Sequence, residues 1–296
     1  MRIHLIDGTF ELFRHFYSPA AALDQRWPEE LRAVRGVVAS ILGLMEGGAT
    51  HVGVATDHII ESFRNALWPG YKTGEGIDPL LYQQFQPLEE ALEAMGLTVW
   101  AMVEFEADDA LAAAAALAAA DERVEQVVIC TPDKDLAQCV RDDRVIQLDR
   151  LRNVERNEAG VIAKFGVPPS SIPDWLALVG DSADGYPGLA GWGAKTASAV
   201  LARYGRLENV PRHAIDWDVP VRGAPKLAAT LTEQRDLALL FRRLATLRED
   251  APVGTDVAAW DWRGPKRAFE AWSQRLGPPS LYDRARELAA RRLGAN

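Results

Sequence analysis

Short apolar runs alternate, over the first 150 residues, with stretches in which apolar residues recur every three to four positions. The apolar runs predict strands, and the spaced stretches predict helices. Strands are expected at residues 2–6, 51–55, 97–102, 124–131 and 145–148. Helices are expected at residues 10–16, 31–46, 80–95 and 108–120. This order predicts an α/β fold with a mostly parallel sheet and helices on both of its faces.

The pattern changes near Pro168. Beyond it, prolines and glycines separate short helical segments, and the pattern predicts no strand. We therefore expect two regions, an α/β core at 1–168 and a helical region at 169–296. The later helices of the second region are expected at 235–247 and 280–293.

Carboxylates follow four of the predicted strands. They are Asp7, then Asp57, then Glu106, Asp108 and Asp109, and finally Asp133 and Asp135. The carboxyl ends of parallel strands share one edge of a sheet, and ligands gather at that edge. Two more acids, Asp181 and Asp184, lie three residues apart, so a helix there would project both from one face. We expect all nine carboxylates at one site.

Nine acids in one cleft repel each other, and hard divalent cations relieve that repulsion. Mg²⁺ or Mn²⁺ suits an all-oxygen ligand set, whereas zinc would favour His or Cys. Two such ions can promote hydrolysis of a phosphodiester. The alternative is that each acid is a loop residue or a helix cap. That interpretation suits a single acid such as Asp108, before an alanine-rich helix, but not all nine together.

A glycine-rich segment at 188–197 gives a second signal. Its glycines let the main chain approach a phosphate closely, and they are Gly188, Gly191 and Gly193. A helix that begins near residue 194 would offer its first amides to that phosphate. Lys195 adds a charge and Thr196 a hydroxyl. We expect sequence-independent contacts to nucleic acid here.

The composition is that of an ordinary globular protein, with 48% apolar and 25% charged residues. There is neither a signal pattern nor an apolar run near the roughly 20 residues of a membrane helix. Two cysteines provide no disulfide framework, so we expect a cytoplasmic setting and no membrane partner. The net charge of −9 argues against a nucleic-acid partner. If metal ions offset the nine acids, however, the rest of the chain is near neutral.

Taken together, these motifs resemble the bacterial 5′ nuclease domain, which is found fused to DNA polymerase I, in phage exonucleases and in flap endonucleases. The resemblance runs from Ile3 to about Asn209. Its landmarks are Ile6-Asp7-Gly8, Thr56-Asp57, Phe105-Glu106-Ala107-Asp108-Asp109, Thr131-Pro132-Asp133-Lys134-Asp135-Leu136 and Gly180-Asp181-Ser182-Ala183-Asp184-Gly185-Tyr186-Pro187-Gly188. It implies a PIN-like core with an arch near 64–85, followed by a helix–three-turn–helix DNA-binding motif.

The resemblance also implies roles for single residues. The first metal would be bound by Asp7, Asp57, Glu106 and Asp108, and the second cluster would be Asp109, Asp133, Asp135, Asp181 and Asp184. Lys72 matches the catalytic lysine, Arg64 a phosphate-contacting arginine, and Arg14 a basic residue near the active site. The alternative for these three is a solvated surface charge. Main-chain carbonyls of 188–193 are a candidate K⁺ site.

The implied function is 5′-3′ exonuclease and flap endonuclease action on 5′ flaps and on nicked or 5′-ended duplex DNA, in replication or repair. The products would carry a 5′ phosphate. We expect a free-standing monomer, with a DNA polymerase acting in trans. Three positions depart from the family pattern: Glu75 stands where an arginine is usual, Ala190 where a lysine is frequent, and Trp192, which we expect to pack in the core, replaces a smaller apolar residue. A PIN-type ribonuclease and a non-catalytic branched-DNA binding protein are the alternatives.

Overall fold

The computed structural model describes residues 1–18, 28–277 and 280–294, and the chain forms two compact units that do not follow chain order. Unit 1 comprises residues 1–60, 74–131 and 249–296, and unit 2 comprises residues 61–73 and 132–248. The boundary expected near residue 168 stays a prediction. No helix of the described residues is long and apolar enough to cross a membrane.

Unit 1 contains four parallel strands in the order β3-β2-β1-β4. They are β1 (Arg2–Asp7), β2 (His51–Asp57), β3 (Thr98–Met102) and β4 (Gln126–Cys130). Most side chains of β1, β2 and β4 are buried, as expected for parallel strands covered on both faces. These four predicted strands are confirmed.

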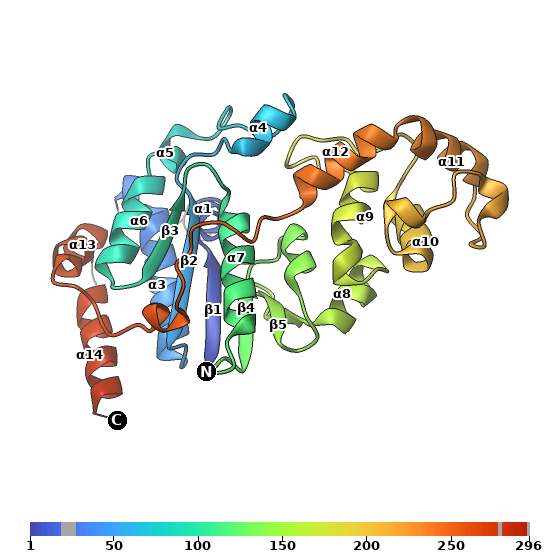
Figure 1. The fold of residues 1–296 in the computed structure, drawn as a ribbon. Coiled ribbons are helices and arrows are strands. Elements are labelled where there is room, and N and C mark those ends of the chain that lie inside the picture. Colours follow the sequence, from blue (N-terminus) through green and yellow to red (C-terminus); the bar gives the residue numbers. More distant parts are fainter. Residues whose placement is uncertain (19–27, 278–279, 295–296) are drawn as a thin grey trace. The chain divides into compact units, whose positions relative to one another are not determined.

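Helices cover both faces of this sheet (Figure 1). The connections from β1 to β2 and from β2 to β3 carry α1 (Gly8–Phe16), α3 (Arg32–Glu46) and α6 (Phe85–Ala94). The connection from β3 to β4 runs the opposite way across the sheet and carries α7 (Ala107–Ala120). Right-handed crossovers therefore place α7 on the other face. Two short elements, η1 (Glu29–Leu31) and α5 (Pro79–Tyr82), complete this part.

The single helix expected at 80–95 is instead two helices, α5 and α6, which are separated near Gln84. The Gln84 side chain is fully buried, and its Oε1 accepts hydrogen bonds from Ala33 N (3.0 Å) and Val34 N (3.3 Å) at the start of α3. Its Nε2 donates to Leu80 O at 3.0 Å. The break therefore allows a buried amide to satisfy the first amides of α3.

The C-terminal segment of unit 1 contains η6 (Val257–Trp260), α13 (Ala268–Leu276) and α14 (Leu281–Leu293). Buried Arg35 of α3 donates from Nη1 to Leu276 O (2.9 Å) and Gly277 O (2.5 Å). Trp262 Nε1 donates to Met95 O at 2.8 Å. These buried bonds tie the end of the chain to helices near its beginning.

Unit 2 is mainly helical. Its elements are α4 (Phe63–Leu67), η2 (Asp135–Cys139), β5 (Val145–Asp149), β6 (Val154–Arg156), α8 (Glu158–Phe165), η3 (Pro169–Ser171), α9 (Ile172–Val179), α10 (Ala194–Tyr204), η4 (Leu207–Asn209), η5 (Ala214–Asp216), α11 (Ala224–Glu233) and α12 (Arg235–Ala245). The strands β5 and β6 pair antiparallel, and α9 packs against α10 and α12. Trp192 is buried with its ring 6.1 Å from that of Trp217, which confirms that it packs in the core.

Candidate metal centre

In unit 1, Asp7 and Asp57 are the last residues of β1 and β2, so they lie at the carboxyl edge of the sheet. Asp7 also caps α1, because its Oδ1 accepts from Phe10 N at 2.8 Å, and its Oδ2 accepts from the Thr131 hydroxyl at 3.0 Å. A Cβ on the next residue, Gly8, would lie 2.8 Å from Thr56 Cγ2 and 2.9 Å from Ala55 O. The Asp-Gly pair therefore lets α1 begin directly against β2.

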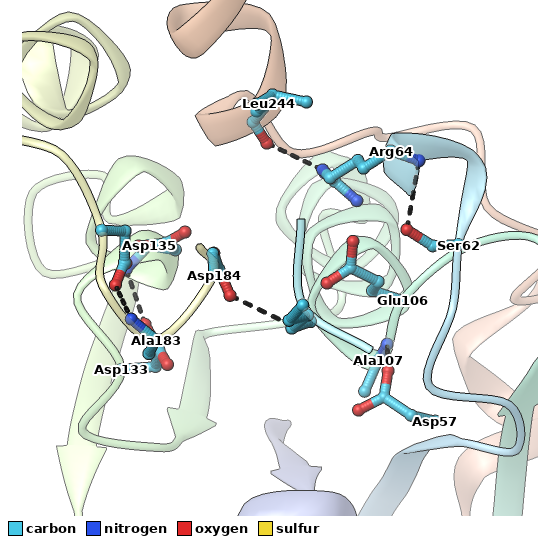
Figure 2. Close-up of polar contacts among 12 residues, drawn as sticks. Asp57, Ser62, Arg64, Glu106, Ala107, Asp133, Asp135, Ala183, Asp184 and Leu244 are labelled. Atoms are coloured by element: carbon cyan, nitrogen blue, oxygen red, sulfur yellow. Dashed lines mark hydrogen bonds and ion pairs between the residues drawn. The ribbon is translucent and has the colours of Figure 1, made fainter. Parts of the chain in front are cut away.

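The other predicted ligands of unit 1, Glu106, Asp108 and Asp109, lie at the start of α7. Asp57 Oδ1 accepts a hydrogen bond from Ala107 N at 2.8 Å (Figure 2), and Asp109 Oδ2 accepts one from Glu106 N at 3.0 Å. Some of these carboxylates thus act as caps, but a carboxylate has about four lone-pair sites, and a cap uses only one. Within the described part of unit 1, no three acids come as close together as those of unit 2.

Unit 2 brings together Asp135, Asp181 and Asp184. One carboxylate oxygen of each lies within 4.8 Å of the others. Asp135 and Asp181 are buried, and Asp184 is half-buried. Asp133 stands beside this group and accepts from Asp135 N at 2.9 Å (Figure 2). The structure thus assembles three of the five acids expected in the second cluster.

The helix considered for Asp181 and Asp184 is not present. Helix α9 ends at Val179, and the next residue, Gly180, has φ +84°. Asp181 then pairs with Tyr186 in an antiparallel bridge, with N–H···O distances of 2.8 and 3.0 Å. At the base of this loop, a Cβ on Gly188 would lie 2.4 Å from Gly180 N. A tight loop, rather than a helix turn, therefore brings the two acids together.

Two lysines contact this acid cluster. Lys134 Nζ lies 2.5 Å from Asp181 Oδ2, and Lys72 Nζ lies 3.4 Å from Asp184 Oδ1. Burial disfavours the charge of Lys134, but its hydrogen bond to Asp181 and the charge of that acid outweigh this effect and raise the lysine pKa. Lys72 is among the residues expected from the sequence, whereas Lys134 is not. The available signal was its position between two predicted ligands, Asp133 and Asp135.

Asp135 carries the clearest electrostatic perturbation. Burial raises its pKa well above the usual value, and the neighbouring Asp133, Asp184 and Asp181 raise it further. Its Oδ1 is buried, and no group of the described chain bonds to it. A buried oxygen without a partner, in a set that contains only oxygen donors, fits a hard divalent cation. Such an ion would also offset the mutual repulsion of the three acids.

The predicted arginines have partners within their own units. Arg64 is 1% exposed, with Nε donating to Leu244 O (2.7 Å, Figure 2) and Nη2 to Thr246 O (3.2 Å) at the end of α12. Arg14 pairs with buried Glu11 on α1. The phosphate-contacting role of Arg64 and the active-site role of Arg14 stay predictions. For Arg64 the structure adds a second role, which is to satisfy carbonyls at a helix end.

The glycine-rich segment leads into α10, as expected. Gly193 precedes the helix, and Lys195 is exposed in the first turn beside Thr196. A Cβ on Gly193 would meet no atom within 4 Å, so this backbone is open to an approaching group. Gly188 has a different role, because it lies at the base of the loop that carries Asp181 and Asp184. The K⁺ site at 188–193 stays a prediction.

Charge is divided unevenly between the units. Unit 2 has 19 Lys and Arg against 16 Asp and Glu, although four of the predicted ligands are among its acids. Unit 1 has 14 Lys and Arg against 26 Asp and Glu. Unit 1 therefore has a formal net charge of −12 and unit 2 one of +3, which together give the −9 of the whole chain.

Two family models match this chain. Residues 2–166 match the 5′-3′ exonuclease N-terminal resolvase-like domain, and residues 167–268 match the 5′-3′ exonuclease C-terminal SAM fold. The two regions and the acids at the sheet edge define a nuclease with a resolvase-like domain and a helical domain. The chain belongs to the 5′-3′ exonuclease family.

Known proteins agree with this assignment. DNA polymerase I of Pseudomonas aeruginosa is 34% identical over 263 residues, which are 86% of this chain and 28% of the polymerase. The chain thus spans less than a third of that relative. The bacteriophage T5 D15 protein, crystallised with metal ions, shares the fold with a TM-score of 0.66 at 17% identity, covering 98% of this chain and 99% of its own. Flap endonuclease-1 from Methanococcus jannaschii has a TM-score of 0.58 at 14% identity, covering 98% and 93%.

Proposed function

We propose that this protein is a Mg²⁺- or Mn²⁺-dependent 5′-3′ exonuclease and flap endonuclease that acts on DNA. The observation that carries the proposal is the group formed by Asp135, Asp181 and Asp184, with Lys72 beside it. An all-carboxylate group with a buried unpaired oxygen is a site for a hard divalent ion. Family membership gives the class of reaction, which is phosphodiester hydrolysis.

The residues of each unit have separate tasks in this proposal. Asp135, Asp181 and Asp184 hold a divalent ion in unit 2, and the sheet-edge acids Asp7, Asp57, Glu106 and Asp108 hold another in unit 1. When bound, such ions activate water and stabilise the leaving 3′ oxygen of a phosphodiester. The Lys72 ammonium adds positive charge where the phosphate develops negative charge.

Two features of unit 2, its charge and the start of α10, support DNA as the substrate. Its excess of basic residues provides the electrostatic attraction to a phosphate backbone. The exposed first turn of α10, with Lys195 and the open main chain at Gly193, suits a sequence-independent phosphate contact. A solved complex of the T5 D15 protein contains DNA and metal ions, at 18% identity and a TM-score of 0.62, covering 98% of each chain.

The test compares single carboxylate variants from the two units on a 5′-labelled flap in Mg²⁺. Asp57→Asn and Asp184→Asn should each lower the cleavage rate by more than about a hundredfold, or about 2.7 kcal/mol of transition-state stabilisation. Asp216→Asn, an exposed acid of unit 2, is the matched control and should cleave normally. If Asp184→Asn cleaves at the wild-type rate, the unit 2 cluster takes no part in the reaction. An RNA flap cleaved faster than the matched DNA flap would instead identify a ribonuclease.

A further inference from the structure

Tyr186 lies directly opposite Asp181 in the loop that carries the acid cluster. The two residues exchange both main-chain hydrogen bonds, Asp181 N to Tyr186 O at 2.8 Å and Tyr186 N to Asp181 O at 3.0 Å. Residues that face each other in an antiparallel pair project their side chains to the same side. The phenol of Tyr186 therefore lies on the same side of this bridge as the Asp181 carboxylate.

The phenol is buried without a hydrogen bond. Tyr186 is 1% exposed, and its ring stacks on that of Phe241, with centroids 5.5 Å apart and planes inclined by 30°. Within the described chain, no group bonds to its Oη. An unpaired buried hydroxyl destabilises the folded state, and native proteins keep few such groups. A phenylalanine would fill the same space without that cost. The hydroxyl therefore indicates a hydrogen-bond partner that binds to the protein from outside.

The surroundings identify what the hydroxyl faces. Burial raises the pKa of the Tyr186 phenol, and the charges of Asp135, Asp184 and Asp181 raise it further, against a smaller opposing effect from Arg64. These three acids are the group whose oxygens lie within 4.8 Å of one another. A phenol hydroxyl can donate a hydrogen bond, and the bridge to Asp181 places this one on the same side as that carboxylate. Asp135 Oδ1 of the cluster is likewise buried without a bond.

We propose that Tyr186 Oη is a positioning donor for the unit 2 metal site, which donates to a carboxylate oxygen or a water of the cluster once a divalent ion is bound. The inference rests on the proposed function, in that the cluster must bind such an ion. Groups that hydrogen-bond to metal ligands orient those ligands, and their loss typically costs 10- to 100-fold in affinity or activity. Tyr186 would thus set how tightly this site holds its ion.

The test is Mn²⁺ binding to the full chain, measured by electron paramagnetic resonance and by calorimetry, for wild type and Tyr186→Phe. The Phe variant should bind Mn²⁺ at the unit 2 site about tenfold more weakly. Its melting temperature in EDTA should equal or exceed that of wild type, because an unpaired buried hydroxyl has been removed. Tyr204→Phe is the matched control. Its hydroxyl donates to Asp218 Oδ1 at 2.8 Å on the surface of the same unit, and its Mn²⁺ affinity should be unchanged.

A third variant, Asp135→Asn, separates the two proposals. If Asp135→Asn loses one Mn²⁺ site while Tyr186→Phe binds like wild type, the cluster is a metal site and the role of Tyr186 is overturned. If Asp135→Asn binds Mn²⁺ like wild type, the unit 2 cluster is not a metal site, and both proposals fail. A Phe variant that melts lower in EDTA and binds Mn²⁺ normally would show a purely structural tyrosine.

Discussion

The burial of Arg64 gives the sharpest prediction, because the predicted phosphate contact and the observed helix capping have different consequences. In Arg64→Met, the carbonyls of Leu244 and Thr246 lose the donors Nε (2.7 Å) and Nη2 (3.2 Å). A hydrogen bond from a charged group contributes about 1.5–3 kcal/mol, so the two together contribute about 3–6 kcal/mol. That is a large share of the roughly 5–15 kcal/mol that stabilises a typical domain.

Hydrogen exchange followed by mass spectrometry measures this loss where it occurs. Amides of α12 and of its packing partner α9 should exchange faster in Arg64→Met, while those of β1 and β2 should not change. Arg64→Lys keeps the charge but not the planar fork of donors, so its exchange rates should lie between those of wild type and those of Arg64→Met. Arg243→Met, which changes an exposed arginine of α12, is the control. If Arg64→Met exchanges like wild type and yet no longer cleaves DNA, Arg64 does not stabilise the end of α12.

Three further predictions follow from charge. Glu75→Arg should tighten binding to flap DNA and steepen the dependence of log Kd on log salt by about 1, which fluorescence anisotropy would detect; an unchanged slope would show that this position lies off the DNA path. Arg242 lowers the pKa of Glu208 to about 2, so this carboxylate stabilises the fold above its ordinary pKa of 4.5 and loses that effect as the pH falls toward 2. The unscreened effect is about 3.4 kcal/mol, but because the Glu208 side chain is 47% exposed we expect Glu208→Gln to cost only about 1 kcal/mol at pH 7 and nothing near pH 2 in urea titrations. Mn²⁺ at 100 times its Kd should stabilise wild type by about 2.7 kcal/mol per site relative to EDTA, as measured by thermal melts. Asp135→Asn should lose the stabilisation that one of these sites provides.

Much of the α/β core could be predicted, because parallel strands buried on both faces leave continuous apolar runs in the sequence. The acids after those runs were equally visible, since the carboxyl ends of parallel strands meet at one edge. For Asp181 and Asp184 the spacing of three fitted a helix and a tight loop equally well. Backbone contacts at Gly180 and Gly188, which the sequence pattern does not display, decide for the loop.

Other features depend on contacts between distant parts of the chain. The capping of α12 by Arg64 joins residues 180 positions apart, and Arg35 binds the end of α13 across 241 positions. No local sequence pattern predicts either hydrogen bond. Net charge was misleading for a related reason, because the acids and bases segregate only when the chain folds into its two units. The unpaired hydroxyl of Tyr186 likewise becomes visible only when its surroundings are known.

The proposed nuclease function is tested most directly by a cleavage assay on a 5′-labelled flap of a nicked DNA duplex in Mg²⁺, Mn²⁺ or EDTA. We predict release of a short labelled fragment with either metal and none in EDTA. Fragment length would distinguish trimming from the 5′ end from cleavage at the junction. If the flap binds but no product forms with either metal, the protein is a DNA-binding module and the catalytic assignment of its carboxylates is contradicted.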